Sequence, residues 1–518
     1  MVMLFTAIAY ATRAQGLDEQ INEAFMPVAI SWENLIFTPL NIGPYSIPIV
    51  LILLMGGASF FTVYFGFVNL KHFRTAIGIV RGKYQDITPH QEDITDTIRD
   101  ETQDGELKPL QALTTAISGT VGLGNIAMVA VAISIGGPGA TFWMIIAGLL
   151  GMSSKFVECT LAVKYRTIDD NNRVHGGPMY YLSKGLSQKG FSRFGKFLAI
   201  WFSVMCIGAS FGGGNAFQTN QAAAQIIDRF GLEGDAIGTI IGLVFAILAG
   251  IVILGGIQRI GKVTEKIVPF MAALYVGACL FVLISHWSEL GDALGIIIGE
   301  AFTPRATITG GFIGVMIQGF RRAAFSNEAG AGSAAIAHAA VKTRYAASEG
   351  LVALLEPFID TVVICTMTAL VIVLFNMNDV FTYGNVIDNQ ALLTATGERI
   401  GGINITSMAF DSSIPGFSYV LVIAVTLFAF STIISWSYYG LQSWTYLFGK
   451  SKLADLSFKL LFLVFTVLGS AVTLDAVIKF SDAMILALVF PNMIGLLFLF
   501  DKVKQELKIF LRDISDKV

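Results

Sequence analysis

Charged residues are scarce in this chain. Asp, Glu, Lys and Arg make up only 14% of its 518 residues, whereas 54% are hydrophobic. Soluble domains usually carry about 25% charged residues. Because charge must cover the exterior of a soluble protein of this size, the composition excludes a soluble globular fold and indicates a membrane protein.

Cysteine and histidine are also few, at four and five residues. Every cysteine lies inside an apolar run and none belongs to a CxxC or Cys/His pattern, which argues against a disulfide framework or a zinc site. An HExxH motif is missing, and the GxxxxGK run from Gly190 has Phe197 where a nucleotide-binding loop needs Ser or Thr. The basic residues lie mainly in the segments between apolar runs and do not form the pattern of a nucleic-acid-binding groove. We therefore expect no enzyme, no organic cofactor and no nucleic-acid binding.

The hydrophobic residues gather in runs of membrane length. A bilayer core of about 30 Å requires about 20 apolar residues in a helix. Windows of this length predict an all-α polytopic membrane protein. Its eleven transmembrane helices are expected near residues 45–68, 110–134, 138–163, 197–222, 237–256, 266–286, 308–338, 349–374, 416–448, 460–474 and 480–500. The stretch 17–36 mixes charged and apolar residues and predicts a helix lying on the membrane surface.

Lysine and arginine divide unequally between two sets of loops. Of the 34 basic residues, five lie on one side, three lie inside spans and 26 lie in 69–109, 164–196, 257–266, 339–348, 449–459 and 501–518. The side rich in Lys and Arg is normally cytoplasmic. This pattern predicts a bacterial-type plasma membrane protein with its N-terminus outside and its C-terminus in the cytoplasm.

Three regions follow from these spans. They are an extracytoplasmic segment 1–44, a single transmembrane domain 45–500 and a cytoplasmic tail 501–518. Residues 1–11 are apolar but too short to cross a membrane, and they predict a signal-like start. The loop 86–106 carries eight acidic residues and has no predicted role.

Two predicted spans contain glycine and polar residues where the others are apolar. The second includes residues 118–125 (SGTVGLGN) and the seventh residues 326–333 (SNEAGAGS). Glycine lowers helix stability by about 1 kcal/mol relative to alanine, so each cluster predicts an unwound segment. The two spans are five apart and run in opposite directions, which is typical of the binding site in an inverted-repeat transporter. Helix packing through small residues is the alternative.

The second span offers ligands for both an anion and a cation. A break at Gly122 and Gly124 frees backbone amides, which suit a carboxylate, and backbone carbonyls, which suit a hard cation. Thr120 and Asn125 add side-chain oxygens.

Polar side chains in two other spans extend this set. Asn215 and Gln218 share a face of the fourth span, where they either contact substrate or hold helices together. Ser431 and Thr432 lie near the middle of the ninth span. Their hydroxyls either complete a sodium shell or bond their own backbone four residues back.

Ionisable residues inside spans are costly unless they are paired. For Glu328, an ion pair with Arg321 or Arg322 is the alternative to a ligand role. Lys155 and Glu158, three residues apart, are predicted to pair with each other.

A further carboxylate pair lies in the eighth span. Glu356 and Asp360 share a helical face, because they are four residues apart. They either relay protons or, in the case of Glu356, cap and kink the helix.

A series of polar and glycine-rich motifs runs along the chain: TVGLGNIA, GGPGATFWM, GMSSKFVE and LAVKYR within 115–166, and FGGGNAFQTN, RRAAFSNEAGAGSAAIAHAA, EPFIDT and FAFSTIISWSYYG further along. Together these motifs resemble the alanine/glycine:cation symporter family. These motifs occur in order between about 45 and 500. The chain departs from the pattern at Met128, which would narrow the space near a substrate, and at Ala335.

This resemblance implies sodium-driven uptake of alanine, and often glycine. It also implies a 5+5 inverted repeat of the leucine-transporter and amino-acid/polyamine type, with one extra N-terminal helix and repeats near 110–286 and 308–500. Sodium would bind the carbonyls of Ser118 and Val121 together with Ser431 and Thr432. The amino acid would bind near Thr120, Gly122, Gly124, Asn125, Asn215, Gln218 and Ser326.

The hypothesis is a sodium-coupled symporter for a small neutral amino acid that works by alternating access in the lipid bilayer. We expect it to work as a monomer. Proton coupling through Glu328 or Asp360 is the nearest alternative. An ion channel is less favoured, because no symmetric filter motif or ring of carboxylates is present.

Overall fold

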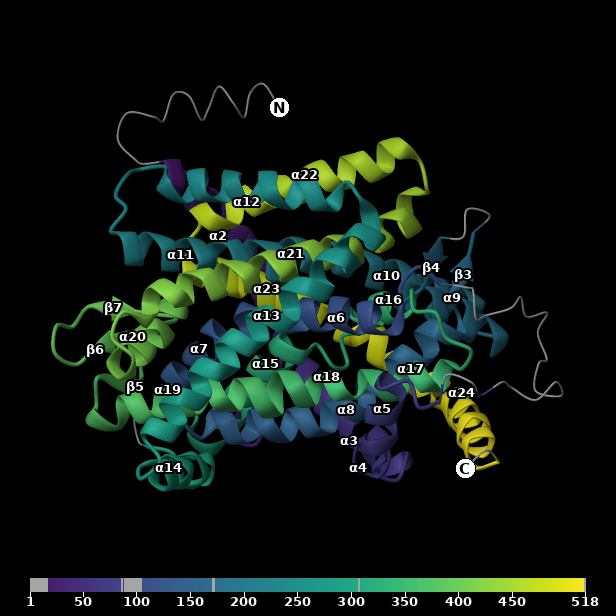
Figure 1. The fold of residues 1–518 in the computed structure, drawn as a ribbon, viewed down its shortest axis with the longest axis horizontal. Helices are drawn as coiled ribbons and strands as arrows, with labels where there is room; N and C mark the ends of the chain where they lie inside the picture. Colours follow the sequence, from purple (N-terminus) through teal and green to yellow (C-terminus); the bar gives the residue numbers. More distant parts are fainter. Residues whose placement is uncertain (1–16, 85–86, 88–104, 170–172, 306–307, 517–518) are drawn as a thin grey trace.

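The computed structural model describes residues 17–84, 87, 105–169, 173–305 and 308–516 (Figure 1). The predicted signal-like start 1–11 and most of the acidic loop 86–106 lie outside these residues. Helices dominate the described part. Its N-terminal elements are α2 (Leu17–Ile36), the hairpin of β1 (Pro39–Ile42) and β2 (Tyr45–Pro48), α3 (Ile49–Tyr64), α4 (Val68–Lys71) and α5 (Phe73–Val80).

The next elements form the first half of the bundle. They are α6 (Pro109–Thr120), the short 3-10 turn η2 (Leu123–Asn125), α7 (Ala127–Gly136), α8 (Ala140–Lys164), the paired strands β3 (Thr167–Ile168) and β4 (Val174–His175), α9 (Pro178–Gln188), α10 (Ser192–Phe211), the π-helix η3 (Gly212–Ala216), α11 (Phe217–Phe230), α12 (Ile237–Ile253) and α13 (Gly256–Ser285).

The second half begins after α14 (Leu290–Phe302). It comprises α15 (Gly311–Asn327), α16 (Ala335–His338), α17 (Ala346–Ala353), α18 (Leu355–Pro357), the π-helix η4 (Phe358–Cys365), α19 (Thr366–Phe375), η5 (Asn376–Asn378), a sheet of β5 (Phe381–Ile387), β6 (Gln390–Leu393) and β7 (Arg399–Ile400), α20 (Ile403–Ser413), α21 (Phe417–Phe448), α22 (Lys452–Ala471), α23 (Leu474–Ala487) and α24 (Val489–Ser515).

Both predicted breaks are present. The first separates α6 from α7, and the two parts of this span meet at an angle of 50°. The second follows α15, where the backbone is left-handed at Glu328 (φ 54°), Gly330 (φ 93°) and Gly332 (φ 84°). Residues with a Cβ atom rarely adopt this backbone conformation, so the two glycines allow the chain to leave the helix here.

The predicted spans coincide with helices. Among the described residues, seven helices are long and apolar enough to cross a membrane, or eight if the bent pair α6–α7 counts as one span. The helices α3 and α12 are apolar but shorter. Each of the eleven predicted spans overlaps a helix, while the number of crossings and the inverted relation of the two halves stay predictions.

Helix boundaries differ from the predictions where polar residues prolong a helix. The helix α22 begins eight residues before the predicted start at 460, because the Ser451 hydroxyl accepts a hydrogen bond from the Ala454 amide and caps it. The helix α24 continues through most of the predicted tail. The predicted surface helix coincides with α2, which packs against α23.

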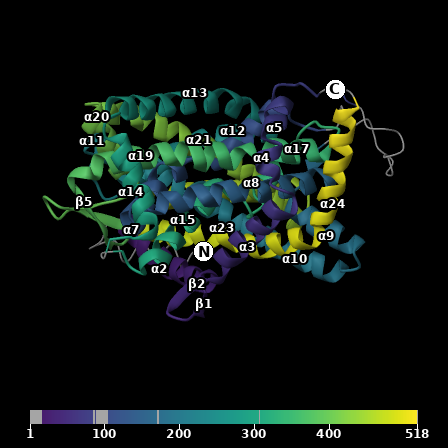
Figure 2. The same cartoon turned by 90° about the horizontal axis from the view of Figure 1, so that it is seen from below.

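Connections gather at two ends of the bundle. In Figure 1, α14 and β5–β7 lie at the left end, whereas α9, β3, β4 and the C-terminal end of α24 lie at the right end. Figure 2 shows the same separation after a quarter turn. The right-hand elements all belong to the loops predicted as cytoplasmic, and the orientation of the chain in a membrane stays a prediction.

Candidate functional site

The first break frees two backbone carbonyls. The Gly122 amide donates to Asn125 Oδ1 (3.0 Å), and the Asn125 amide donates to the Gly122 carbonyl (3.2 Å). In an uninterrupted helix these two amides would donate to the carbonyls of Ser118 and Val121. Those carbonyls therefore lose their helical donors, which makes them available to a cation.

Two backbone amides of the same break donate hydrogen bonds to side-chain oxygens. Asn125 accepts from Gly122, and Gln218 Oε1 accepts from the Leu123 amide at 3.0 Å. The predicted site residues Asn125 and Gln218 therefore meet at the break, although they lie on η2 and α11.

The backbone of the break lies directly against α21. A Cβ atom at Gly122 would lie 2.5 Å from Thr432 Oγ1 and 3.1 Å from Gln218 Oε1. Ser118 Oγ donates to the Ser431 carbonyl (3.1 Å) and hydrogen-bonds Ser435 Oγ. The geometry therefore brings the predicted sodium ligands on α6 and α21 together.

The hydroxyls on α21 also bond their own helix. Ser431 Oγ and Thr432 Oγ1 each donate to the Phe428 carbonyl at 3.0 Å. A hydroxyl that donates its hydrogen keeps oxygen lone pairs that can bind a cation. The backbone bonds and a sodium shell are therefore compatible.

Both broken helices meet at Asp360 of η4. Asn125 Nδ2 donates to Asp360 Oδ1 (2.6 Å), and Ser326 Oγ donates to Asp360 Oδ2 (2.7 Å). Thr361 Oγ1 also donates to Oδ2 at 2.7 Å. Gly124 extends the contact, because its Cβ would lie 3.5 Å from Ser326 Cα. A single buried carboxylate thus joins the two interrupted segments.

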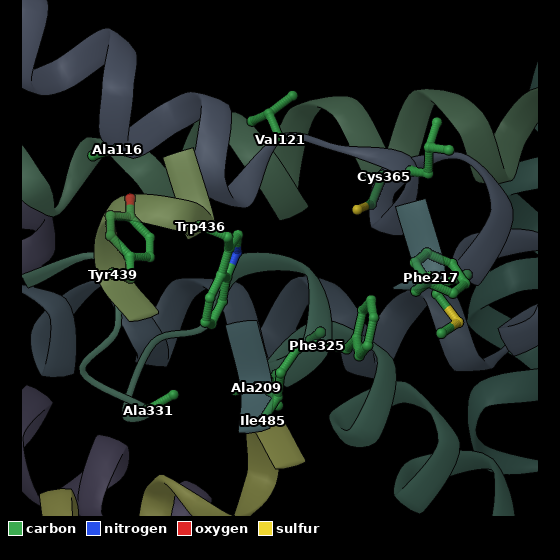
Figure 3. Packing of buried hydrophobic residues seen from close by; sticks show 14 of the residues in the cluster. Ala116, Val121, Ala209, Phe217, Phe325, Ala331, Cys365, Trp436, Tyr439 and Ile485 are labelled. Carbon is green, nitrogen blue, oxygen red and sulfur yellow. The ribbon is translucent and has the colours of Figure 1, made fainter. Parts of the chain in front are cut away.

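Trp436 lies between the two breaks. Its Nε1 donates to the Gly119 carbonyl of α6 and to Glu328 Oε1, both at 3.1 Å. The ring lies against the glycine run of η3, where a Cβ at Gly214 would be 2.2 Å from it. Figure 3 shows Trp436 among side chains from both broken helices, including Val121 and Phe325.

The alternative that the sequence left open for Glu328, an ion pair with Arg321 or Arg322, does not form between these described side chains. Glu328 accepts from Trp436 and from Ser333 Oγ. The backbone of Glu328 is in the left-handed region, and the residue lies past the end of α15. Its side chain therefore does not share a helix face with the two arginines.

The two arginines instead bind Asp482 of α23. Arg321 Nε and Arg322 Nη2 reach Asp482 Oδ2 at 2.7 Å and 2.5 Å, and Arg321 Nη2 reaches Glu33 Oε1 of α2 at 2.7 Å. Arg322 Nη1 also lies 2.9 Å from the sulfur of Met128.

The predicted pair of Lys155 with Glu158 is also wrong. Lys155 Nζ lies 3.3 Å from Glu356 Oε2 and donates to the Asn327 carbonyl at 3.0 Å, whereas Glu158 Oε1 accepts from Asn492 Nδ2 at 2.9 Å. Although the two residues are three apart on α8, packing places a partner from another helix beside each of them.

Two predicted substrate residues lie apart from these contacts. Asn215 Nδ2 donates to the Phe462 carbonyl of α22 at 2.7 Å, and Thr120 Oγ1 bonds the carbonyls of Ala116 and Ile117 in its own helix. Contact of either residue with substrate stays a prediction.

The predicted site residues are closed off from solvent. Their side chains are 0–4% exposed at Ser118, Thr120, Val121, Asn125, Asn215, Gln218, Ser326, Ser431 and Thr432. A substrate can therefore reach them only if the surrounding helices move.

Sequence reasoning missed three contributors. Trp436 stands four residues after Thr432 and so shares its helical face, which was an available signal. Asp360 was considered only for proton relay. Asn327, whose Nδ2 donates to Thr361 Oγ1 at 2.8 Å, gave no separate signal within its polar run.

Comparison with known proteins shows clear relatives. A model of the sodium:alanine symporter family matches residues 33–517. The chain is 38% identical over 469 residues to the sodium/alanine symporter AgcS of Methanococcus maripaludis, covering 90% of this chain and 94% of that protein.

Two relatives from Bacillus subtilis are each 34% identical to this chain. The putative sodium/proton-dependent alanine carrier protein YrbD covers 89% of both chains, and the probable sodium/glutamine symporter GlnT covers 78% of this chain and 79% of its own. Among solved structures, MhsT in complex with L-phenylalanine covers 77% of this chain and 99% of its own, with 14% identity and a TM-score of 0.49.

Proposed function

The chain belongs to the sodium:alanine symporter family, and on this premise we propose that it couples sodium entry to the import of alanine, with glycine as a second substrate. Transport would proceed by alternating access. The observation that carries the proposal is the meeting of two interrupted helices at buried polar groups, with Asn125 and Ser326 both bound to Asp360.

The proposed sodium site consists of the Ser118 and Val121 carbonyls with the Ser431 and Thr432 hydroxyls. Two features support it: both carbonyls have lost their helical donors, and Thr432 Oγ1 lies against the backbone of Gly122. Neutral oxygen ligands suit a hard monovalent cation.

The proposed amino-acid site lies beside this sodium site. The amides of Gly122 and Leu123 now donate to the side-chain oxygens of Asn125 and Gln218. In the proposed complex they would donate to the substrate carboxylate instead. Thr120, Gly124, Asn215 and Ser326 complete the proposed set. Sodium at the adjacent carbonyls would stabilise the same backbone geometry, so the affinity for each solute would rise when the other is bound.

The proposed topology follows the distribution of basic residues. We place the N-terminus outside and the C-terminus in the cytoplasm of a bacterial-type plasma membrane, with a segment 1–44, a transporter domain 45–500 and a tail 501–518. The two repeats would span about 110–286 and 308–500, and a single chain would be the working unit.

Proton coupling is the second candidate, and Asp360 favours it. This buried carboxylate accepts hydrogen bonds from Asn125, Ser326 and Thr361, and it has no ion-pair partner among the described residues. A carboxylate in that position can bind either a cation or a proton.

One experiment separates the two candidates. Proteoliposomes carrying the purified protein should take up labelled alanine with an inward sodium gradient, and uptake should collapse when choline replaces sodium at fixed pH. Competition with unlabelled glycine and glutamine tests the substrate, since we expect glycine but not glutamine to compete. Equal uptake driven by a pH gradient without sodium would refute sodium coupling.

A pair of threonine variants tests the sodium site. Thr432→Ala should raise the sodium concentration for half-maximal uptake by about tenfold or more, because it removes one proposed ligand. Thr466→Ala is the matched control, because Thr466 on α22 is also buried and also bonds the carbonyl four residues before it. Unchanged sodium dependence in a folded Thr432→Ala protein would contradict the assignment.

A further inference from the structure

Four buried charged side chains lie beside the second break, and the proposed transport site uses none of them. His338 Nδ1 lies 2.6 Å from Glu349 Oε1, and His338 Nε2 hydrogen-bonds Glu356 Oε1. Glu356 Oε2 lies 3.3 Å from Lys155 Nζ. The four side chains are between 0 and 3% exposed and come from α8, α16, α17 and α18. We call them the charged quartet.

The quartet is electrically balanced. Both ring nitrogens of His338 face carboxylate oxygens, which can only accept hydrogen bonds when ionised. A neutral imidazole has a single N–H, so two ionised partners require the imidazolium form. The two cations Lys155 and His338 then match the two anions Glu349 and Glu356. Balance of this kind is what permits charges at full burial.

One member of the quartet holds the second broken helix. Lys155 Nζ donates to the carbonyl of Asn327, the last residue of α15, at 3.0 Å. A helix C-terminus has unbonded carbonyls and a negative partial charge, so an ammonium group is a favourable partner there. Beyond the break, His338 of α16 binds Glu356, which in turn binds Lys155 of α8.

A short series of hydrogen bonds connects this contact with the proposed site. Asn327 Nδ2 donates to Thr361 Oγ1 (2.8 Å), and Thr361 Oγ1 donates to Asp360 Oδ2 (2.7 Å). Asp360 in turn accepts from Ser326 and Asn125. The ammonium of Lys155 therefore fixes the peptide that follows Asn327, one residue beyond Ser326.

We propose that the charged quartet is a positioning device for amino-acid binding. It fastens both ends of the second break to α8, so that Ser326 and Asn327 hold the geometry that binds substrate and move with α8 as one body. The proposal rests on the transport function proposed above and assigns a role to residues outside the binding site.

Single substitutions in the quartet cannot test this role, because each leaves an unpaired buried charge that destabilises the fold. The test therefore removes one cation and one anion together. In Lys155→Met with Glu356→Gln, the remaining His338 and Glu349 stay balanced and the shapes are nearly kept. The Asn327 carbonyl, however, loses its donor.

The expected result is a change in substrate affinity in a folded protein. The double variant should reach the membrane in wild-type amount, and its KM for alanine should rise by about tenfold while the maximal rate falls less than threefold. The matched control is Lys164→Met on the same helix, which removes only an exposed pair with Glu506 and should leave KM unchanged. A wild-type KM in the double variant would overturn the proposal.

A second pair keeps the test decisive if the first variant does not fold. His338→Gln with Glu349→Gln removes the outer cation and anion but leaves Lys155 bound to Glu356. Its KM should rise by about threefold, because α16 is released while α15 stays held. An unchanged KM here would also overturn the proposal. Absence of sodium-driven alanine uptake in the wild-type protein would instead refute the proposed function, so the two failures are distinguishable.

Discussion

At the scale of single residues, Gly122 decides how closely the elements of the site approach one another. It has no side chain, and Thr432 of α21 and Gln218 of α11 fill the space where a Cβ would stand. Its amide turns to Asn125 instead of continuing the helix. The missing side chain and the redirected amide together create the proposed ion and carboxylate contacts.

Gly122→Ala should therefore strongly reduce transport in a protein that still folds. The added methyl would lie 2.5 Å from Thr432 Oγ1, so the break and α21 must separate. Alanine uptake should fall by about tenfold or more. Gly277→Ala in α13 is the control, since nothing lies within 4 Å of the added atom there. Wild-type uptake by Gly122→Ala would contradict the proposed close contact at the break.

At the scale of elements, Asp482 of α23 holds the broken helix α15 in place. It binds both Arg321 and Arg322, and Arg322 is almost completely buried. Arg321 also reaches Glu33, so α2 is attached to this junction as well. These contacts join segments that are far apart in the sequence.

Asp482→Asn should lower stability strongly. It leaves the buried guanidinium of Arg322 without its anion, which typically costs about 3–5 kcal/mol. The melting temperature of the purified protein should fall clearly below that of the wild type. Asp388→Asn, which removes an ion pair with Arg399 that is exposed on both sides, should change it little. Equal melting temperatures for the two variants would show that the junction contributes no such stability.

At the scale of the whole molecule, the burial of the proposed site requires movement during transport. Cys365 can report this movement, because its Sγ lies 3.3 Å from both Asn125 Nδ2 and Ser326 Oγ and is buried. A thiol reagent can reach it only when the helices open.

A polar thiol reagent should inactivate the transporter slowly, and Cys365→Ser should resist it. Saturating alanine with sodium should slow inactivation by about threefold or more, because bound substrate blocks access. Cys279→Ser is the control, since Cys279 lies on α13. Inactivation that persists in Cys365→Ser would show that the reagent acts elsewhere.

Local composition was sufficient to predict the helices and the two breaks. Runs of apolar residues must be helical in a membrane, and clustered glycines weaken a helix wherever it lies. These effects act between neighbours in the chain, so the predicted spans and both interruptions correspond to elements of the structure.

Only the tertiary structure decided which polar groups pair across the bundle. Lys155 was expected to bind Glu158 on its own helix and binds Glu356 instead, and Glu328 binds Trp436 rather than an arginine nearby in the chain. Buried charges take the partner that packing brings nearest, and that partner lies on another helix. The sequence by itself thus determined a membrane protein with two interrupted helices, whereas the packing of those helices decided that Asp360 joins them.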